Sequence, residues 1–166
     1  MKKAFLISFI VLSVFVVASC ATTKATQKAG DYSLSLPEAY EYNTAESMNA
    51  EPGCVGVFTD PEKKLPELWV YSFNTNGRNL ETFVEEKTLE FNADKTAVYG
   101  KYKVNGQNLD GAVIEFNENW YDTKYYNYYH IVKMDDGTFM CLDFACNPDV
   151  DAEASLKAVQ SVLKHL

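Results

Sequence analysis

The sequence predicts an α+β domain in which a mostly antiparallel sheet of about six or seven strands is packed by two helices. Short alternating, aromatic or β-branched segments recur along the chain, and Asn-Gly and Asp-Gly turns join the later ones. Two longer segments carry apolar residues at helical spacing. Hairpins pair strands antiparallel, and amphipathic helices must bury their stripes against the sheet. The predicted order is three strands, a helix, four strands and a helix, with no repeat and no second domain.

The first three predicted strands occupy residues 32–36, 54–58 and 68–73. In the first, Tyr32, Leu34 and Leu36 alternate with serines until Pro37, as expected of a half-buried strand. The second is followed by an Asp-Pro turn signal, and the third, LWVYSF, is rich in aromatic and β-branched residues. Residues 38–53 have no clear period and are predicted to form a loop, with a single helical turn as the alternative.

A helix is predicted to follow Asn79, a residue type that suits an N-cap. Leu80, Phe83, Val84 and Phe91 fall on one of its faces. Glutamates cover the opposite side: Glu81, Glu85, Glu86 and Glu90. This pattern is typical of a helix that lies on a core with its acidic side toward solvent.

Four more strands are predicted at residues 97–104, 109–116, 125–134 and 138–144. Asn105-Gly106 joins the first two as a hairpin, and Asp136-Gly137 lies in the turn between the last two. Residues 117–124 between the middle pair are predicted to form a polar loop that carries Trp120 and Tyr121.

The last predicted helix spans about residues 152–166. Acidic residues stand near its start and basic residues near its end, which complements the helix dipole. Leu156, Val159, Leu163 and Leu166 are predicted to form its core-facing stripe.

The first twenty residues are typical of a secretory signal peptide, with two lysines before an apolar run and small residues at its end. Val17-Ala18-Ser19-Cys20 resembles the lipobox of bacterial lipoproteins, in which the cysteine carries the lipid. The alternative is an uncleaved membrane anchor, although the run is short for one. We therefore expect a signal peptide over 1–19, a lipidated Cys20 with a flexible tether to residue 30, and one domain over 31–166.

The remainder of the chain is strongly acidic. Without Lys2 and Lys3 it has 13 basic and 23 acidic side chains, a net charge of −10. Phosphate backbones and anionic headgroups repel such a surface, which argues against nucleic-acid binding and leaves lipid at Cys20 as the membrane contact. Because Ala21 is not the aspartate associated with inner-membrane retention in some lipoprotein systems, we expect placement in the outer membrane of the cell envelope.

Residues 31–166 resemble the PsbP-like family of photosystem II extrinsic subunits, a Ran-binding nuclear-transport factor and many bacterial lipoproteins. The resemblance lies in the opening strand YSLSLP at 32–37, the Asp136-Gly137 turn before residues 139–144, and the closing helix segment AVQSVL at 158–163. It implies an α/β sandwich without catalytic activity that binds another protein. No binding motif of that family is matched here, so no functional residue is transferred.

Three cysteines follow Cys20. In an exported protein, Cys54 could pair with Cys146 or with Cys141, or all three could be small buried thiols. A zinc site built from these cysteines and His130 lacks the close cysteine pairs that such sites use.

No enzyme class has a motif in this sequence. His130 is expected on a strand face with tyrosines, where a hydrogen-bonded core histidine is commoner than a catalytic base. Asp143 could accompany it in a triad, but no nucleophile elbow, phosphate-binding loop or dinucleotide fingerprint is present. We expect no catalysis, no cofactor and no metal.

Trp120 and Tyr121 are the candidate contact residues. Tyrosine and tryptophan combine a flat apolar body with a polar tip, the mixture enriched at binding hot spots. We predict that they contact an envelope protein partner, with a glycan or small molecule as the alternative ligand.

Overall fold

The computed structural model describes residues 24–120, 122–150 and 152–164, so Cys20, Tyr121 and the expected signal peptide lie outside the described residues. The elements, in chain order, are β1 (Lys24–Ala29), β2 (Tyr32–Pro37), β3 (Glu41–Tyr42), α1 (Thr44–Asn49), β4 (Cys54–Thr59), β5 (Glu67–Asn74), α2 (Leu80–Glu90), β6 (Val98–Val104), β7 (Gln107–Trp120), β8 (Thr123–Lys133), β9 (Thr138–Cys146) and α3 (Ala152–Leu163). The predicted seven strands and two long helices are confirmed, and α1 is the short helical segment that was the alternative to a loop over residues 38–53. β1 and β3 are additions.

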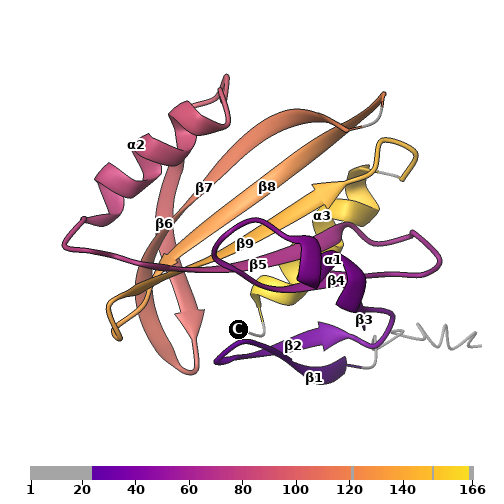
Figure 1. Ribbon diagram of the computed structural model, residues 1–166, viewed down its shortest axis with the longest axis horizontal. Coiled ribbons are helices and arrows are strands. Elements are labelled where there is room, and N and C mark those ends of the chain that lie inside the picture. The colour runs from indigo at the N-terminus through magenta and orange to yellow at the C-terminus, as the bar shows by residue number, and fades with distance from the viewer. Residues whose placement is uncertain (1–23, 121, 151, 165–166) are drawn as a thin grey trace, which may run out of the picture.

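Seven strands form one antiparallel sheet in the order β3-β4-β5-β9-β8-β7-β6 (Figure 1). The predicted hairpin at Asn105-Gly106 is confirmed, because both residues have the positive φ that a tight hairpin turn demands, 49° and 84°. β1 and β2 pair in a separate two-stranded sheet. The chain leaves the large sheet at β5, which neighbours the central strand β9, and returns at the far edge as β6, with α2 between.

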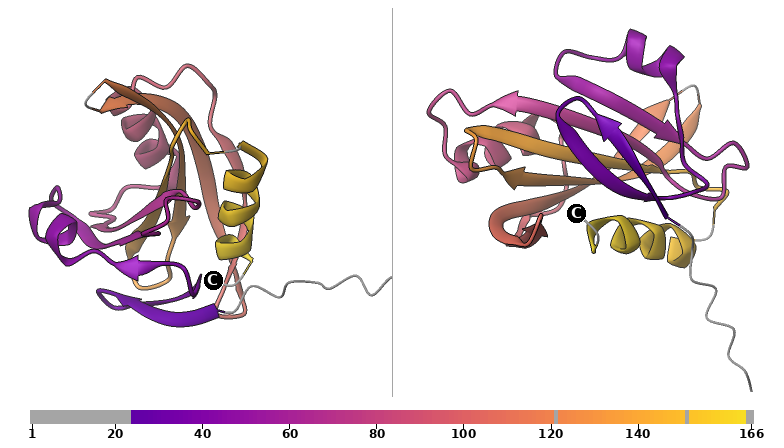
Figure 2. Two further views of the ribbon diagram at one scale, coloured as in Figure 1. Left: turned by 90° about the vertical axis from the view of Figure 1, so that its right-hand side faces the viewer. Right: turned by 90° about the horizontal axis from the view of Figure 1, so that it is seen from below.

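The large sheet separates two cores, as Figure 2 shows with α2 on one side and α3 on the other. Along β9 the side chains alternate, so that Phe139 and Cys141 pack under α2 whereas Met140 and Leu142 pack toward α3. The core on the α3 side also takes Leu34 from β2, which places the small sheet on that side. The arrangement is an α+β sandwich, as the sequence predicts.

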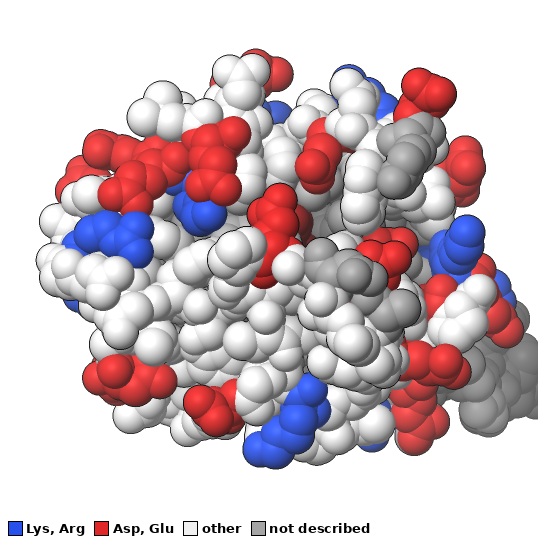
Figure 3. All heavy atoms as spheres, in the orientation of Figure 1, with Lys and Arg blue, Asp and Glu red and all other residues white. Residues whose placement is uncertain are grey.

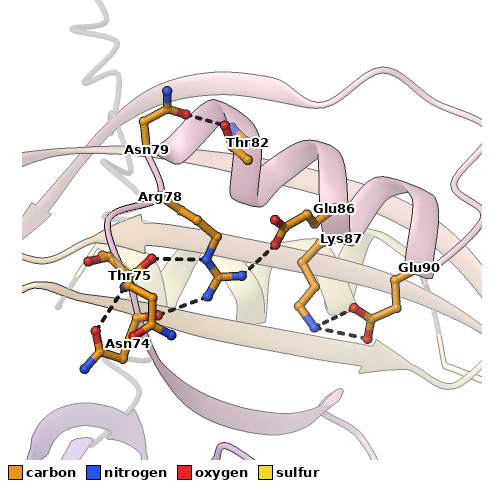
Figure 4. Close-up of polar contacts among 9 residues, drawn as sticks. Asn74, Thr75, Arg78, Asn79, Thr82, Glu86, Lys87 and Glu90 are labelled. Carbon is orange, nitrogen blue, oxygen red and sulfur yellow. Dashed lines mark hydrogen bonds and ion pairs between the residues drawn. The ribbon is translucent and has the colours of Figure 1, made fainter.

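α2 is held at its first turn by polar contacts (Figure 4). The Asn79 side chain accepts a hydrogen bond from the Thr82 amide at 2.8 Å, which confirms the predicted N-cap. Arg78 donates to the carbonyl oxygens of Asn74 and Thr75 at the end of β5 and pairs with Glu86 on the helix at 2.6 Å. The end of β5 and the start of α2 are therefore joined by one guanidinium group.

The predicted apolar stripe of α2 is confirmed. Phe83 and Val84 are buried, and the Phe83 ring stacks on Phe139 with centroids 4.3 Å apart. The glutamates that were predicted to face outward are exposed, and Figure 3 shows acidic side chains gathered over this helix. Among the described residues, no helix is long and apolar enough to cross a bilayer.

The predicted stripe of α3 is partly wrong. Val159 is buried as expected, but Leu156 is 38% exposed. The buried face consists of Ser155, Ala158, Val159 and Val162, and Leu166 lies outside the described residues. Small residues at two of these positions let the helix approach β2 and β9 closely, which turns Leu156 toward solvent.

The expected tether over 21–30 is also wrong in its second part, because residues 24–29 form β1. Gly30 has φ of 56°, which allows the tight turn into β2. Ala29 is fully buried beside Gly56, and Gln27 Nε2 donates to the Tyr40 carbonyl at 2.6 Å. The segment gains its order from backbone pairing and from a buried methyl group, neither of which produces a hydrophobic pattern in the sequence.

Candidate functional site

The end of the β7–β8 hairpin extends past its neighbouring strands. β6 pairs with β7 only as far as Val113, and β9 pairs with β8 only as far as Tyr126. Beyond those points β7 and β8 pair with each other up to Trp120 opposite Thr123. The polar loop predicted over 117–124 is therefore wrong: β7 continues to Trp120 and β8 begins at Thr123, and Asp122 before it adopts φ of 64°.

Trp120 lies against Trp69, with ring centroids 6.0 Å apart and planes inclined by 61°. Trp69 stands on β5 and Trp120 on β7, and β9 and β8 separate these strands in the sheet. The two indoles therefore meet across the two middle strands. Trp120 remains 43% exposed, whereas Trp69 is half-buried.

Asn127 and Asp143 are the polar side chains of those middle strands on the same face. Asp143 pairs in register with Trp69, and Asn127 pairs with Ala145, which follows Asp143 by two positions. Asn127 Nδ2 donates to Asp143 Oδ2 at 3.4 Å. The Oδ1 atoms of both residues are shielded from solvent and have no hydrogen-bond partner among the described residues. We call Trp69, Trp120, Asn127 and Asp143 the Trp-capped site.

The electrostatic environment of the Trp-capped site is acidic. Burial raises the pKa of Asp143 to about 8, and the Glu118 carboxylate adds to this increase while the Asn127 amide opposes it. Burial also raises the pKa of Tyr71 on β5, where the charges of Asp143 and Glu118 contribute. At neutral pH the Asp143 carboxyl group is therefore mostly protonated. A shielded acceptor without a partner, such as Asn127 Oδ1, favours a ligand that donates hydrogen bonds.

A cavity of about 230 Å³ opens beside this site at the end of the sheet. It reaches the Trp-capped site at Ala145, which lies on the same face between the Asn127 and Glu67 positions of the adjacent strands. The residues that line it are Asn43, Thr59, Asp60, Pro61, Lys63, Leu65, Glu67, Tyr125, Ala145 and Asn147. The cavity therefore has room for a small polar group next to Asn127 and Asp143.

His130 lies on the other face of the sheet and is 6% exposed. Its Nδ1 is 2.7 Å from the Tyr102 hydroxyl, and burial lowers its pKa to about 4, with the Glu115 charge opposing this change. A neutral, hydrogen-bonded core histidine is what the sequence predicts. Its Nε2 has no partner among the described residues. Because Asp143 faces the opposite side, the two cannot form a triad.

Lys95, Glu115 and Tyr126 form a network near the edge of the sheet. Lys95 Nζ contacts Glu115 Oε2 at 2.5 Å and the Tyr126 hydroxyl at 2.7 Å, and that hydroxyl donates to Glu115. These bonds lower the pKa of Glu115 and raise that of Lys95. Each of these polar groups has a hydrogen-bond partner within the network, so the network stabilises the β7–β8 hairpin where Glu115 and Tyr126 lie.

Cys54, Cys141 and Cys146 are free thiols in the structure, which does not contain the bridge from Cys54 to Cys146 or Cys141 that the sequence left possible. Cys54 and Cys141 both pair in register with Tyr71 on the α2 face, whereas Cys146 points to the α3 side opposite Tyr126. The sheet itself separates Cys54 from Cys146. Burial raises the pKa of Cys141 to about 12 and that of Cys146 to about 11. No cluster that could hold a metal ion occurs among the described residues.

The overall arrangement is shared with solved structures. A crystal structure from Bacteroides thetaiotaomicron VPI-5482 matches with a TM-score of 0.53 at 13% identity, over 86% of this chain and 48% of that one. The present chain thus spans about half of that protein. The solution structure of cyanobacterial PsbP (CyanoP) from Synechocystis sp. PCC 6803 matches with a TM-score of 0.52 at 13% identity, over 86% of this chain and 88% of that one. The fold is PsbP-like.

At this identity the likeness concerns the fold alone. No family model matches the sequence, and no curated protein matches it. The PsbP-like fold that the sequence predicts is confirmed by this structural similarity.

Proposed function

We propose that this protein is a lipid-anchored, non-catalytic binding module of the bacterial cell envelope, most simply of the outer membrane. The proposal combines the signal-peptide pattern with the cysteine at position 20 and an alanine at position 21. The net charge of −10 on the remainder of the chain disfavours electrostatic binding to anionic lipid. Acyl chains on Cys20 would supply the membrane affinity instead, at about 0.8 kcal/mol per buried CH₂.

The observation that carries the binding role is the exposed Trp120 packed on Trp69 at the end of a hairpin that projects beyond the sheet. A tryptophan held by a second ring loses little conformational freedom when it is buried by a partner. Such pre-ordered aromatic residues are enriched at interface hot spots. The partner in this proposal is another envelope protein.

A glycan or small molecule is the second candidate, because the cavity beside the Trp-capped site is lined by Tyr125 and polar groups. The two candidate ligands differ in the surface that they would bury. A protein partner would cover the hairpin end, whereas a small ligand would enter the cavity.

Affinity capture from solubilised native membranes tests the binding role. Trp120→Ala and Tyr121→Ala should abolish recovery of the partner, while Tyr99→Ala should not, since Tyr99 is an aromatic of similar exposure, 51%, on the distant strand β6. Equal recovery with all three variants would contradict the protein-binding proposal. If only glycan binding were lost with Trp120→Ala, the second candidate would replace it.

Membrane fractionation tests the anchor. Cys20→Ser removes the thiol that accepts lipid, so the exported protein should move from the membrane to the soluble fraction. Cys54→Ser is the control, because that thiol lies within the folded domain. Retention of Cys20→Ser in the membrane would mean that the anchor is not lipid on this residue.

A further inference from the structure

We propose that the Trp-capped site binds the cationic end of a lysine or arginine side chain, which donates hydrogen bonds to Asn127 Oδ1 and Asp143 Oδ1 between the two indole rings. This inference rests on the proposed function, since it assigns the chemistry by which a partner protein would be recognised. It names a site that the exposed aromatic residues alone do not indicate.

The first argument is the kind of atom that lacks a partner. Asn127 is 1% exposed, and its Oδ1 is a shielded acceptor without a donor among the described residues. Asp143 Oδ1, which is also shielded and without a partner among these residues, becomes a second acceptor when the carboxyl group ionises. A buried acceptor that stays unpaired has lost its hydrogen bonds to water without replacement, so a donor group that reaches both oxygens gains binding free energy. Ammonium and guanidinium groups carry several donors and accept none.

The second argument is charge. Among the described residues, the groups that interact with Asp143 on its face of the sheet are Glu118 from β7, Tyr129 from β8, Tyr71 from β5 and Cys141 from its own strand, and none of these is a cation. At the adjoining cavity, Glu67 accepts a hydrogen bond from Trp69, and the Lys63 charge acts on Glu67. On α2, Lys87 is paired with Glu90 at 2.8 Å and lies over the Phe73 ring. Glu51 and Cys54 approach Tyr71 from the segment before β4 and from its start. Among the described residues, Lys63 and Lys87 are therefore the neighbouring cations, and they face Glu67 and Glu90, whereas the charge that acts on Asp143 is that of Glu118.

The third argument is the aromatic cover. Organic cations are attracted to the faces of tryptophan rings, most strongly where water is excluded. Trp69 and Trp120 meet above the strands that carry the two oxygens, and Trp120 belongs to a hairpin end that pairs with no third strand. Displacement of Trp120 from Trp69 would admit a side chain, and the cavity at Ala145 adjoins the opening.

The chain offers a direct reporter, because it contains two tryptophans and both belong to the site. Nα-acetyl-lysine amide and Nα-acetyl-arginine amide should change tryptophan emission saturably in the purified domain. Nα-acetyl-norleucine amide, which lacks the charge, should not. Asp143→Asn should weaken the two cations by about tenfold or more, since a hydrogen bond to a charged group contributes about 1.5–3 kcal/mol. Asp110→Asn, the same substitution at an exposed position of β7, should leave binding unchanged.

Proton release gives a second readout. Because Asp143 holds a proton at neutral pH and a bound cation favours its carboxylate, calorimetry at pH 7 in two buffers of different ionisation heat should show up to about one proton released. Binding without proton release, or equal binding by Asp143→Asn, would overturn the cation site. Tighter binding of free cadaverine than of the lysine amide would contradict a protein side chain as the ligand.

The two proposals fail separately. Loss of the cation site with intact Trp120-dependent capture of a partner would refute this inference alone. Cation binding without any captured partner would refute the protein-binding function and leave a site for small amines.

Discussion

Asp143 is a carboxyl group in the middle of a buried strand, and its protonation links the candidate site to folding. Its pKa is about 8 in the folded protein against an ordinary value of 3.8. Between these values the folded state binds more protons than the unfolded state, so the free energy of unfolding falls as pH rises. His130 acts in the opposite sense, because its pKa falls from 6.5 to about 4, and its contribution is complete above pH 6.5.

The fall in unfolding free energy with rising pH, and the pH range in which it occurs, give a prediction for Asp143→Asn. Urea unfolding of the wild type should show stability that falls from pH 6.5 to pH 8, and the variant should lack this slope. At pH 8 the variant should be more stable by roughly 2 kcal/mol or more. The wild type has to keep a proton on Asp143 or bury its charge at a pH where the unfolded carboxyl group is ionised in water, and the asparagine has to do neither. Asp110→Asn is the control. Parallel curves for the wild type and Asp143→Asn would show that Asp143 is solvated like an ordinary carboxyl.

The sequence shows Asp143 as a single acidic residue in the apolar segment FMCLDFAC. It does not show which residues surround Asp143 in the folded protein. Asn127 lies among tyrosines, and Trp69 lies far from Trp120 along the chain. Only the order β5-β9-β8-β7 and the register bring these groups to one face. Strand patterns predict which face a residue takes within its strand, but the pairing of distant strands is a tertiary property.

At the scale of the strand pair β6–β7, two glycines face each other in register with opposite surroundings. A Cβ on Gly111 would lie 2.5 Å from Tyr102 Cδ2 and also collide with the Ile131 carbonyl, because the Tyr102 ring covers this position. A Cβ on its partner Gly100 would meet nothing within 4 Å. The ring reaches across to His130, so Gly111 also positions the buried hydrogen bond.

Alanine substitution at the two glycines should therefore give different results. Gly111→Ala should destabilise the domain by about 1–3 kcal/mol through overpacking. Gly100→Ala should be neutral or stabilising by up to about 1 kcal/mol, since alanine restricts the unfolded chain. Denaturant midpoints of the two variants measure the difference. Equal losses would show that the Tyr102 ring does not occupy the space over Gly111.

Elements with a strong periodic pattern of apolar residues were predicted well. Elements that are held mainly by backbone pairing or by close contact of small residues were not. α2 has a clear stripe and cap, and its face is confirmed by the Phe83–Phe139 stack. β1 has no pattern because its order comes from β2, and the face of α3 was misjudged because Ser155 and Ala158 pack more closely than Leu156. Small residues at a close contact produce no hydrophobic signal in a sequence.

At the scale of the whole molecule, the two faces of the sheet differ in their cover. α3 and the β1–β2 sheet close one face, whereas α2 covers one end of the other face and α1 lies on that same side at the β3–β4 edge (Figures 1 and 2). The register places Trp69, Trp120, Asn127 and Asp143 on this second face, away from the strand positions that α2 contacts. The sandwich and its PsbP-like form could be predicted from strand order. The proposed partner could not, because a fold hosts many functions and recognition is set by the arrangement of a few side chains.

The central claim is that the Trp-capped site and the hairpin end beside it form the binding surface in the cell envelope. Site-specific photo-crosslinking in living cells tests it, with the crosslinker placed at position 119, an exposed asparagine beside Trp120, and, as the control, at position 99. The account predicts a discrete adduct of higher mass from position 119 that disappears with Asp143→Asn, and none from position 99. Adducts of equal yield at both positions, or at position 99 alone, would contradict it.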